Sequence, residues 1–454
     1  MSTTSPVPAA IEALRLRRLD LAAVAAGDPA ARREHTALVR RGAVPDPAVR
    51  AAARATLAAV RADGDAAVRA ANLEVGGGRP DGRLVLDPTE LREARDRLAP
   101  RIRRALDQAI ANVRRFAETE RPVSTTTTVA PGIEIERRWV PIARVGAYVP
   151  GGSAPYPSSL VMTVVPAQVA GVGAVVIASP AGRDGVTNPV LLGAAGLLDV
   201  DAFIVAGGAQ AIGALAYGLP DARIEPVDRI VGPGNAWVTA AKIELAGEVG
   251  IDLPAGPSEG MVLAAPPADP ARVAADLITQ AEHGPDSPAI LVTTDAVFAD
   301  AVEAAVNRAL EGASRRGILA AALRDHGRIA LAPSLDAAVA FINAYAPEHL
   351  SVDLEPLEPT VERLRNAGSI FVGPWAPESA GDYATGANHV LPTGGLARAS
   401  GALAVETYGK FTQVQRVTRE GLAGIRETVG TLAEAEGLLA HRDAVEIRFR
   451  GDDR

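Results

Sequence analysis

The stretch Ala174-Val175-Val176-Ile177-Ala178 is an uninterrupted apolar run that ends at Ser179-Pro180. A strand that is apolar on both faces is typical of a parallel sheet covered by helices on each side. Short runs at 202–205 and 229–231 repeat the pattern, and each is followed by a glycine-rich turn and a stretch with helical spacing. This alternation predicts an α/β fold built on a parallel sheet.

A second set of apolar runs, at 288–293, 328–331 and 369–372, follows a Pro/Gly-rich loop near residue 258. A chain of 454 residues is longer than one hydrophobic core usually organises, so two or more domains are expected. Two parallel sheets therefore fit the length better than one, with a boundary near residue 258.

The segments before the first sheet are expected to be mainly helical. Asp46-Pro47 and Asp87-Pro88 each resemble an N-cap followed by proline at the first helical position. We expect the second pair to open one helix that runs to about residue 118, with a flexible loop at 76–78 between the two helices. Residues 1–45 are expected to form short amphipathic helices.

Two further local expectations concern the segments around residue 130 and beyond residue 400. Residues 124–128 are polar and are expected to form a loop, whereas Ile133 and Ile135 alternate with glutamates as in a half-buried strand. From about residue 401 the chain is expected to become helical again and to end in a charged tail.

The bulk composition restricts the partners of the protein. The formal net charge of -8 argues against nucleic acid or an anionic membrane as the main partner. Arg15, Arg17 and Arg18 interrupt the first apolar stretch, and no uncharged run reaches the roughly 20 residues that a membrane-spanning helix needs. A cytoplasmic protein is therefore expected. The chain has no cysteine, which excludes disulfides, thiolate ligands and covalent thiol chemistry.

Four of the six histidines, His283, His349, His389 and His441, lie near carboxylate or amide residues. Such grouping favours a metal or proton-transfer site. Gln280 and His283 are three residues apart on a predicted helix, so both could face one divalent ion such as zinc. A histidine that interacts with the helix dipole is the alternative.

Asp382 and His441 could complete a nitrogen and oxygen ligand set, although the sequence alone does not bring them together. Glu348-His349 offers a carboxylate and an imidazole, either of which could accept a proton near neutral pH. A solvated pair in a loop is the alternative for these two residues.

Three glycine-rich turns lie beside predicted strands or helices of the first set, at 148–152, 207–210 and 232–235. None has the GxGxxG pattern, and each alone would indicate only a tight turn. Three such turns in one sheet suggest a ligand crevice at the ends of its strands.

Taken together, these segments resemble the histidinol dehydrogenases from about residue 45 to residue 450. The blocks that carry the resemblance are 146–152, 206–211, 232–235, 249–252, 255–259, 280–283, 345–349, 381–383, 388–393, 435–437 and 440–441. The resemblance implies a zinc-dependent, four-electron oxidation of L-histidinol to L-histidine through L-histidinal, with two NAD⁺ in succession, at the end of histidine biosynthesis.

The resemblance also implies roles for individual residues. His349 would remove the alcohol proton, and Glu348 would activate the water that hydrates the aldehyde. The implied zinc ligands are Gln280, His283, Asp382 and His441. These four and His349 would also contact the substrate, as would Ser258, His389 and Glu436. The implied dinucleotide contacts are Tyr148, Gln210 and Asn235.

The implied architecture comprises two incomplete Rossmann-like domains in a homodimer whose C-terminal segment reaches the partner's site. The expected divisions are a helical segment at 1–45, a first domain at 46–147 and 259–402, a second and NAD-contacting domain at 148–258, and a helical segment at 403–454.

The sequence departs from the family pattern at Gly260, at Gly284 and at 408–411. None of these positions is a proposed ligand, so the departures are expected to affect loop packing rather than chemistry.

Two other functions remain open at this stage. A dehydrogenase of the same architecture could oxidise another small alcohol to its acid, but the presence of both His389 and Glu436 favours histidinol. A non-catalytic dinucleotide- or metal-binding protein would be expected to lose a proton-transfer residue, and both Glu348 and His349 are present.

Overall fold

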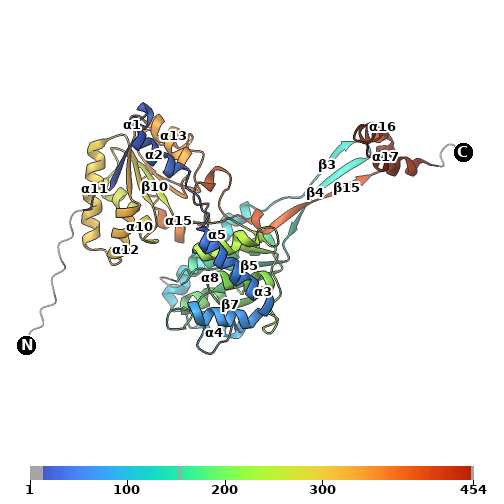
Figure 1. The fold of residues 1–454 in the computed structure, drawn as a ribbon, viewed down its shortest axis with the longest axis horizontal. Coiled ribbons are helices and arrows are strands. Elements are labelled where there is room, and N and C mark those ends of the chain that lie inside the picture. Colours follow the sequence, from blue (N-terminus) through green and yellow to red (C-terminus); the bar gives the residue numbers. More distant parts are fainter. Residues whose placement is uncertain (1–13, 152–154, 451–454) are drawn as a thin grey trace, which may run out of the picture.

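The computed structural model describes residues 14–151 and 155–450. The first 13 residues of the expected N-terminal segment, Gly152 of the 148–152 turn and the end of the charged tail lie outside this part. Figure 1 shows two lobes of helices packed on sheets and a narrow arm that carries the C-terminus. The predicted α/β class with two main sheets is confirmed.

The first lobe contains a fully parallel, six-stranded sheet with the order β1-β12-β11-β10-β13-β14. Its strands are β1 (Arg17–Asp20), β10 (Gly260–Ala264), β11 (Ala289–Thr293), β12 (Arg328–Leu331), β13 (His349–Asp353) and β14 (Ser369–Val372). One face packs against α10 (Pro270–Ala281), α11 (Ala296–Glu311) and α12 (Arg316–Asp325). The other face packs against α1 (Leu21–Ala26), α2 (Pro29–Val39) and α13 (Leu335–Tyr345).

The second lobe contains a six-stranded sheet with the order β2-β7-β6-β5-β8-β9, in which only the short β2 runs antiparallel to its neighbour. Its strands are β2 (Val85–Leu86), β5 (Arg144–Tyr148), β6 (Ala174–Ser179), β7 (Ala202–Val205), β8 (Arg229–Val231) and β9 (Gly250–Ile251). The helices of this lobe are α3 (Pro47–Val75), α4 (Pro88–Asp96), α5 (Pro100–Thr119), α6 (Pro157–Ala170), α7 (Pro189–Leu197), α8 (Gly208–Tyr217) and α9 (Ala236–Leu245).

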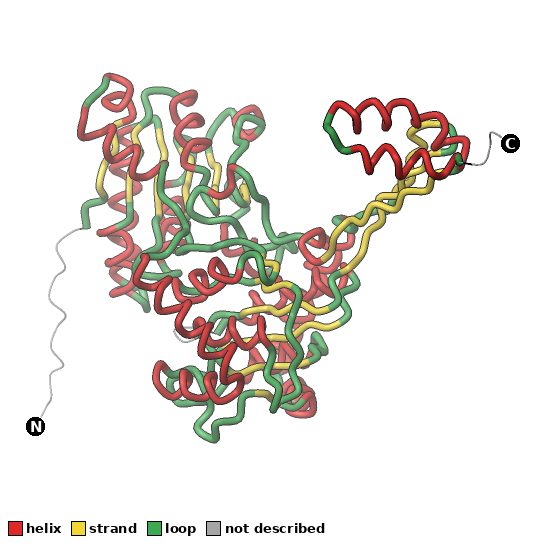
Figure 2. The backbone as a smooth tube through the Cα atoms, turned by 45° about the vertical axis from the view of Figure 1, so that its right-hand side comes forward, coloured by secondary structure: helices red, strands yellow, loops and turns green. Residues whose placement is uncertain are grey.

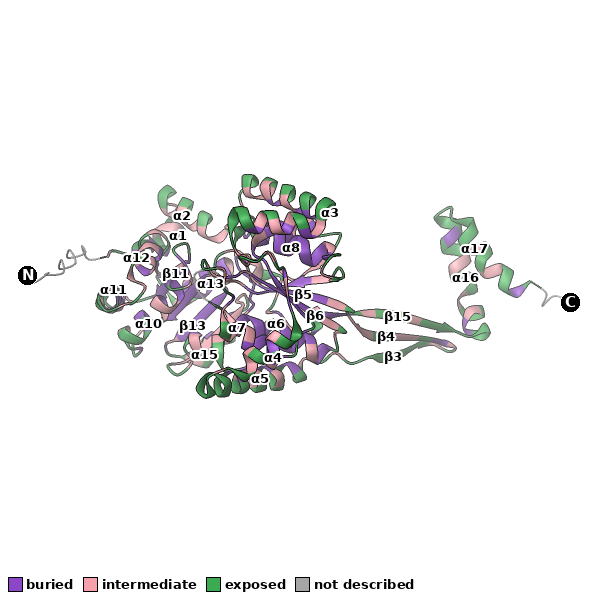
Figure 3. Ribbon diagram, turned by 90° about the horizontal axis from the view of Figure 1, so that it is seen from below, coloured by how far each residue is buried: buried purple, intermediate pink, exposed green. Residues whose placement is uncertain are grey.

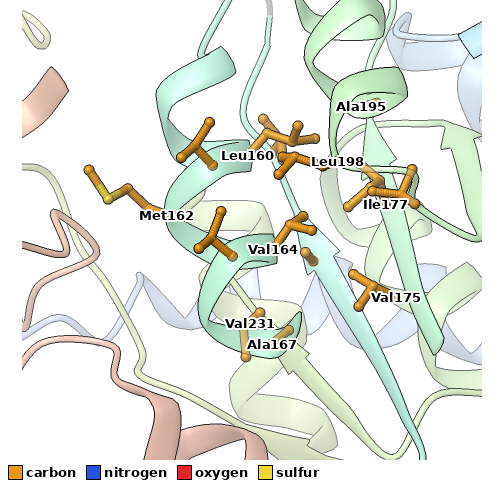
Figure 4. Close-up of a cluster of buried hydrophobic side chains, with 14 of the residues drawn as sticks. Leu160, Met162, Val164, Ala167, Val175, Ile177, Ala195, Leu198 and Val231 are labelled. Atoms are coloured by element: carbon orange, nitrogen blue, oxygen red, sulfur yellow. The ribbon is translucent and has the colours of Figure 1, made fainter. Parts of the chain in front are cut away.

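The core of the second lobe explains the opening sequence run. Val175 and Ile177 of β6 pack against α6 and α7 on one face, as Figure 4 shows for Leu160, Val164 and Leu198. Val176 and Ala178 point into the opposite layer, under α3 and α8. Because both faces are buried, every residue of the run is apolar.

The expected domain boundaries need correction. β2 and β5 pair within the second sheet, so the chain from 46 to 147 does not share a sheet with 259–402. β1, in the segment expected to be only helical, pairs with β12 at the edge of the first sheet. Pairings between strands far apart in sequence leave no local signal, so the sheets to which β1, β2 and β5 belong could not be read from the sequence.

The helix expected at 88–118 is two helices, α4 and α5, and Pro100 begins the second. Proline cannot continue the preceding helix because it lacks the donor and clashes with the previous turn. The N-caps Asp46 and Asp87 are as predicted, each accepting a hydrogen bond from a backbone N–H of its helix. Among the described helices, none has both the length and the apolar character needed to cross a membrane.

The arm is an antiparallel sheet of β3 (Thr125–Ala130), β4 (Ile133–Pro141) and β15 (Gly409–Val417), with α16 (Arg419–Ala435) and α17 (Leu439–Glu446) at its far end. Figures 2 and 3 show how far these two helices stand from both lobes. The strand at 133–135 is confirmed, but the loop predicted at 124–128 is a strand, and a long strand precedes the C-terminal helices.

Candidate active site

The site is built at the start of neighbouring strands in the first sheet. β10 and β13 are parallel neighbours, and their first residues, Gly260 and His349, are paired in register. Glu348 lies directly before β13 and Ser258 two residues before β10, so the two residues lie side by side. The Ser258 hydroxyl donates to Glu348 Oε2 at 2.8 Å, and the backbone N–H of Glu259 donates to the same oxygen at 2.9 Å.

Glu348 is buried, and burial raises the pKa of its carboxyl above the ordinary value, while His349 and the two hydrogen bonds oppose that rise. A carboxyl whose pKa is raised toward neutrality is suited to act as a base for water. Sequence analysis left open a solvated loop pair, but the structure buries both Glu348 and His349.

His349 lies between two carboxylates. Its Nδ1 is 3.6 Å from Glu348 Oε2 and 3.9 Å from Glu378 Oε1. Burial alone would lower the pKa of His349, but these carboxylates outweigh burial and raise the pKa above its usual range. Neither ring nitrogen has a hydrogen-bond partner within the described chain, so both are open to a ligand.

His283, Glu378 and Asp382 form the one cluster of described side chains in which three possible metal ligands meet, with their ligand atoms within 4.8 Å of one another. His283 Nε2 lies 3.5 Å from Glu378 Oε1 and 3.9 Å from Asp382 Oδ2. The two acids are four residues apart on α15 (Glu378–Tyr383), so they share one face of that helix. His283 follows directly after α10 rather than lying on it.

The electrostatic potential at the cluster is strongly negative. Burial would lower the pKa of His283, yet the hydrogen bond and charge of Glu378, together with Asp382 and Glu348, raise the pKa to about 9. A cation placed there would gain from the same charges that favour the imidazolium.

Gln280 completes this side of the site from the last turn of α10. Its Nε2 donates to the Ser258 hydroxyl at 3.3 Å, whereas its buried Oε1 has no partner in the described chain. An orphaned carbonyl oxygen three residues before His283 fits a borderline divalent ion. These residues are therefore chemically suited to hold zinc.

Gly260, expected to matter only for loop packing, bears directly on a proposed ligand. A Cβ built at Gly260 would lie 2.7 Å from both Cγ and Oε1 of Gln280. The Gln280 amide occupies the space that a side chain at position 260 would need. The expectation that Gly260 affects only loop packing was therefore wrong.

His389 borders the same cluster. Its Nδ1 lies 2.9 Å from the backbone oxygen of Asp382, and because a carbonyl only accepts, Nδ1 carries the proton. Burial lowers the pKa of His389, so its Nε2 is free to accept from the Ser159 hydroxyl at 3.2 Å. Ser159 lies on α6, and this bond joins the two lobes.

The glycine-rich turns meet at the carboxyl ends of the strands in the second sheet. Added Cβ atoms at Gly77, Gly151 and Gly207 would each approach Pro180 to between 2.8 and 3.0 Å, and one at Gly232 would lie 2.2 Å from the backbone oxygen of Tyr148. This crowding requires glycine at the turns.

Of the three residues expected at the dinucleotide, each already has a partner within the protein. Tyr148 is buried, burial raises its pKa to about 12, and its hydroxyl accepts from Gly208 N–H at 3.4 Å. Gln210 donates to Asn72 Oδ1 at 3.3 Å, and Asn235 caps α9. By contrast, the N-cap residue Gly207 has no side chain to cap α8, so the N–H groups of the first turn other than that of Gly208, which Tyr148 holds, remain suited to a phosphate.

Two expected site residues lie apart from the rest of the site in this chain. Glu436 ends α16 and His441 lies on α17, both exposed on the far end of the arm. The structure thus gathers Ser258, Gln280, His283, Glu348, His349, Asp382 and His389 around one site, and it leaves these two outside it.

Sequence analysis missed Glu378 and Ser159. Glu378 is 3 % exposed and its Oε1 lies 3.5 Å from His283 Nε2, and its spacing of four from Asp382 was the available signal. Nothing in the local sequence marks Ser159, because its partner His389 is 230 residues away.

Comparisons with known proteins identify relatives of this chain. The family model for histidinol dehydrogenase matches residues 39–449. A histidinol dehydrogenase from Halobacterium salinarum is 45% identical over 412 residues, covering 89% of this chain and 94% of that protein. One from Leifsonia xyli is 45% identical over 414 residues, covering 89% of this chain and 95% of that protein.

A solved structure extends the similarity to the fold. The crystal structure of histidinol dehydrogenase from Elizabethkingia anophelis superposes with a TM-score of 0.89 at 33% identity, covering 98% of this chain and 100% of that one. By its sequence, its fold and the extent of both matches, the chain belongs to the histidinol dehydrogenase family and is an oxidoreductase.

Proposed function

We propose that this protein oxidises L-histidinol to L-histidine through L-histidinal, with two molecules of NAD⁺ and a bound zinc ion. The observation that carries the proposal is the burial of Glu348 and His349 side by side, facing the cluster of His283, Glu378 and Asp382. Two buried proton-accepting residues beside a cation site suit an oxidation that consumes one water, transfers two hydrides and releases three protons, the last from the carboxylic acid of the product.

Gln280, His283 and Asp382 would hold zinc together with His441 of the partner subunit, the site that the sequence resemblance implies. Zinc bound there would supply a redox-inert Lewis acid that orients the amine and imidazole of the substrate. The hydrides are transferred to the nicotinamide of NAD⁺. The N–H groups at the start of α8 are suited to bind a phosphate of the same dinucleotide.

In the first oxidation, the neutral form of His349 accepts the alcohol proton as the hydride leaves carbon, and a cation held by the neighbouring carboxylates would oppose the charges that raise the pKa of His349. The carboxylate of Glu378, 3.9 Å from Nδ1 of His349, stabilises the imidazolium that results. In the second, Glu348 removes a proton from water, which adds to the aldehyde. The hydrate then loses a hydride and a proton to give the acid.

The absence of cysteine strengthens the assignment of Glu348. A thiohemiacetal cannot form on a chain that contains no thiol, so hydration is the remaining route to an acid. Ser258 holds the Glu348 carboxylate in place and is proposed to contact the substrate. His389 and Glu436 of the partner subunit are proposed to hold the substrate as well.

The arm supports a homodimer with shared sites. Leu432, Leu438, Leu439 and Ile447 are 44–58% exposed at its far end, an apolar surface that a second copy would cover. An exchanged arm would bring Glu436 and His441 to the partner's cluster of His283, Glu378 and Asp382.

The test of this function is the ratio of NADH formed to histidinol consumed. Two NADH per histidinol, with histidinol strongly preferred over other amino alcohols, is the expected result. A ratio of one would refute the aldehyde step, and equal turnover of alcohols without an imidazole would favour the alternative that the enzyme oxidises a different small alcohol.

Replacing Glu348 with glutamine is expected to slow the aldehyde step more than the alcohol step. Glutamine can still accept from Ser258 and Glu259 but cannot take a proton, so the loss should be on the order of 10²- to 10⁴-fold for histidinal. Single-turnover assays started with histidinol or with histidinal measure the two steps separately.

The matched control is Glu358→Gln, which alters an exposed glutamate on α14 (Leu357–Val361). It should leave both steps unchanged. Equal slowing of both steps by Glu348→Gln would contradict the division of labour between Glu348 and His349.

A further inference from the structure

Arg41, in the connection between α2 and α3, packs directly behind the site. Its guanidinium meets both carboxylate oxygens of Glu259, with Nε donating to Oε2 at 2.7 Å and Nη2 donating to Oε1. The guanidinium carbon also lies 3.2 Å from the centre of the Tyr345 ring, whose hydroxyl donates to Glu259 Oε2 at 3.4 Å. Arg41, Glu259 and Tyr345 are called the rear triad below.

The rear triad is shielded from water. The side chain of Glu259 is 4% exposed and that of Arg41 16%, while Tyr345 is fully buried. The neighbouring Ala43 is buried as well, and added Cβ atoms at Gly256 and Gly394 would approach it to 3.4 and 2.6 Å. The segment is thus wedged against the loop that leads to Ser258.

The backbone of Glu259 touches both residues proposed to move protons. Its N–H donates to Glu348 Oε2 at 2.9 Å, and its carbonyl oxygen accepts from the His349 N–H at 3.2 Å. The side chain of Glu259 is anchored on Arg41 at the same time. One residue therefore links the rear triad to the site through two short hydrogen bonds.

Arg41 also bonds to the backbone turn that leads to Glu348. Its Nη1 donates to the carbonyl oxygen of Tyr345 at 2.6 Å, and its Nη2 to that of Ala346 at 3.4 Å. Ala346 has a φ of 54°, in the left-handed region that costs a non-glycine residue energy. It stands two residues before Glu348, so Arg41 stabilises the strained turn that aims that carboxylate.

We propose that Arg41 is a positioning residue: its ion pair with Glu259 fixes the peptide of Glu259 and the turn at Ala346, and thereby the orientation of Glu348 and His349. The inference deepens the proposed function and rests on the roles given there to these two residues. Arg41 touches neither substrate nor cofactor, so its effect passes entirely through this geometry.

Lysine cannot replace this arginine. A single ammonium cannot bond both carboxylate oxygens and two carbonyls while lying flat on a tyrosine ring. In the zinc-loaded, full-length enzyme, Arg41→Lys should therefore lower kcat for histidinol and histidinal by on the order of 100-fold, as misplacement of reacting groups does. The KM for histidinol should change much less than kcat, because the proposed substrate ligands Gln280, His283 and Asp382 lie on or beside α10 and α15 and not on the segments that Arg41 holds. Arg40→Lys, at the exposed neighbour, is the matched control and should change neither constant.

A double variant separates positioning from mere stability. Arg41→Met leaves the Glu259 carboxylate buried and unpaired, which should lower the midpoint of thermal unfolding. Adding Glu259→Gln removes that buried charge and should recover much of the midpoint, whereas kcat should stay low because the anchor is still absent. Recovery of kcat in step with the midpoint would overturn the proposal, as would an unchanged kcat in Arg41→Lys. Failure of the wild-type protein to oxidise histidinol would instead refute the proposed function.

Discussion

Protein stripped of metal by a chelator is expected to lose both oxidation steps, and zinc at one equivalent per subunit is expected to restore them. The physical reason is the cluster of His283, Glu378 and Asp382, whose ligand atoms lie within 4.8 Å of one another, together with the orphaned Oε1 of Gln280. Such a concentration of negative charge and unpaired ligand atoms is costly without a cation. Turnover in the stripped and reloaded protein, with metal content measured on the same samples, gives the result.

Zinc binding should also be accompanied by proton release at neutral pH. With a pKa of about 9, His283 is protonated in the metal-free protein below that pH, and an imidazolium cannot be a ligand. Zinc affinity should therefore rise with pH up to about 9 and level off above it. Magnesium is the control, because it prefers oxygen ligands and waters and should not restore turnover. Undiminished activity in protein shown to be free of metal would contradict the assignment.

The two main sheets could be predicted because their strands are buried on both faces. Val175 to Ala178 have no polar residue to interrupt the run, so the pattern depends on burial alone and is visible without an alignment. The arm could not be predicted in the same way. In one chain its strand β3 is exposed along nearly its whole length, and its four threonines in succession look like a polar loop. Their β-branched side chains favour a strand, but no alternation of buried and exposed residues marks it.

The expected site residues were recognised by their chemistry and by the family resemblance, but their convergence is a property of the fold. Glu348 meets Ser258 across 90 residues because β10 and β13 are neighbours. The general expectation for parallel sheets places ligands at the carboxyl ends of strands, and the glycine-rich turns of the second sheet follow it. In the first sheet, however, Ser258 and Glu348 precede their strands. Sequence spacing could not reveal that the functional residues lie at the starts of strands in the first sheet and at the carboxyl ends of strands in the second.

Glu378 shows the limit of reasoning from histidines. Its carboxylate lies closer to His283 than Asp382 does, 3.5 against 3.9 Å, but it stands among ordinary residues in the sequence. Rare residue types attract attention, whereas a common glutamate gains its role only from burial. Where a metal cluster is suspected, acids four residues from a candidate ligand on a helix should be considered with it.

Subunits carrying His283→Ala and subunits carrying His441→Ala are each expected to be inactive alone and to regain activity when mixed. His283 lies in the first lobe and His441 on the distant arm of the same chain. If each arm serves the partner's site, a mixed dimer combines the intact lobe of one subunit with the intact arm of the other. Random exchange makes about half of the dimers mixed, each with one complete site, so activity should approach about a quarter of wild type.

The matched control mixes His283→Ala with Asp382→Ala, two changes in the same lobe. Every site in that mixture keeps one defective lobe, so no activity should return however completely the subunits exchange. Exchange is measured independently with differently tagged subunits. If His283→Ala and His441→Ala subunits exchange and still show no recovery, the arm does not complete the partner's site. The exposed leucines of α16 and α17 would then need another explanation. Recovery in the mixture of His283→Ala with His441→Ala, and none in the mixture of His283→Ala with Asp382→Ala, would assign His441 to the partner's site. Only a site built from two chains makes the two mixtures differ in activity.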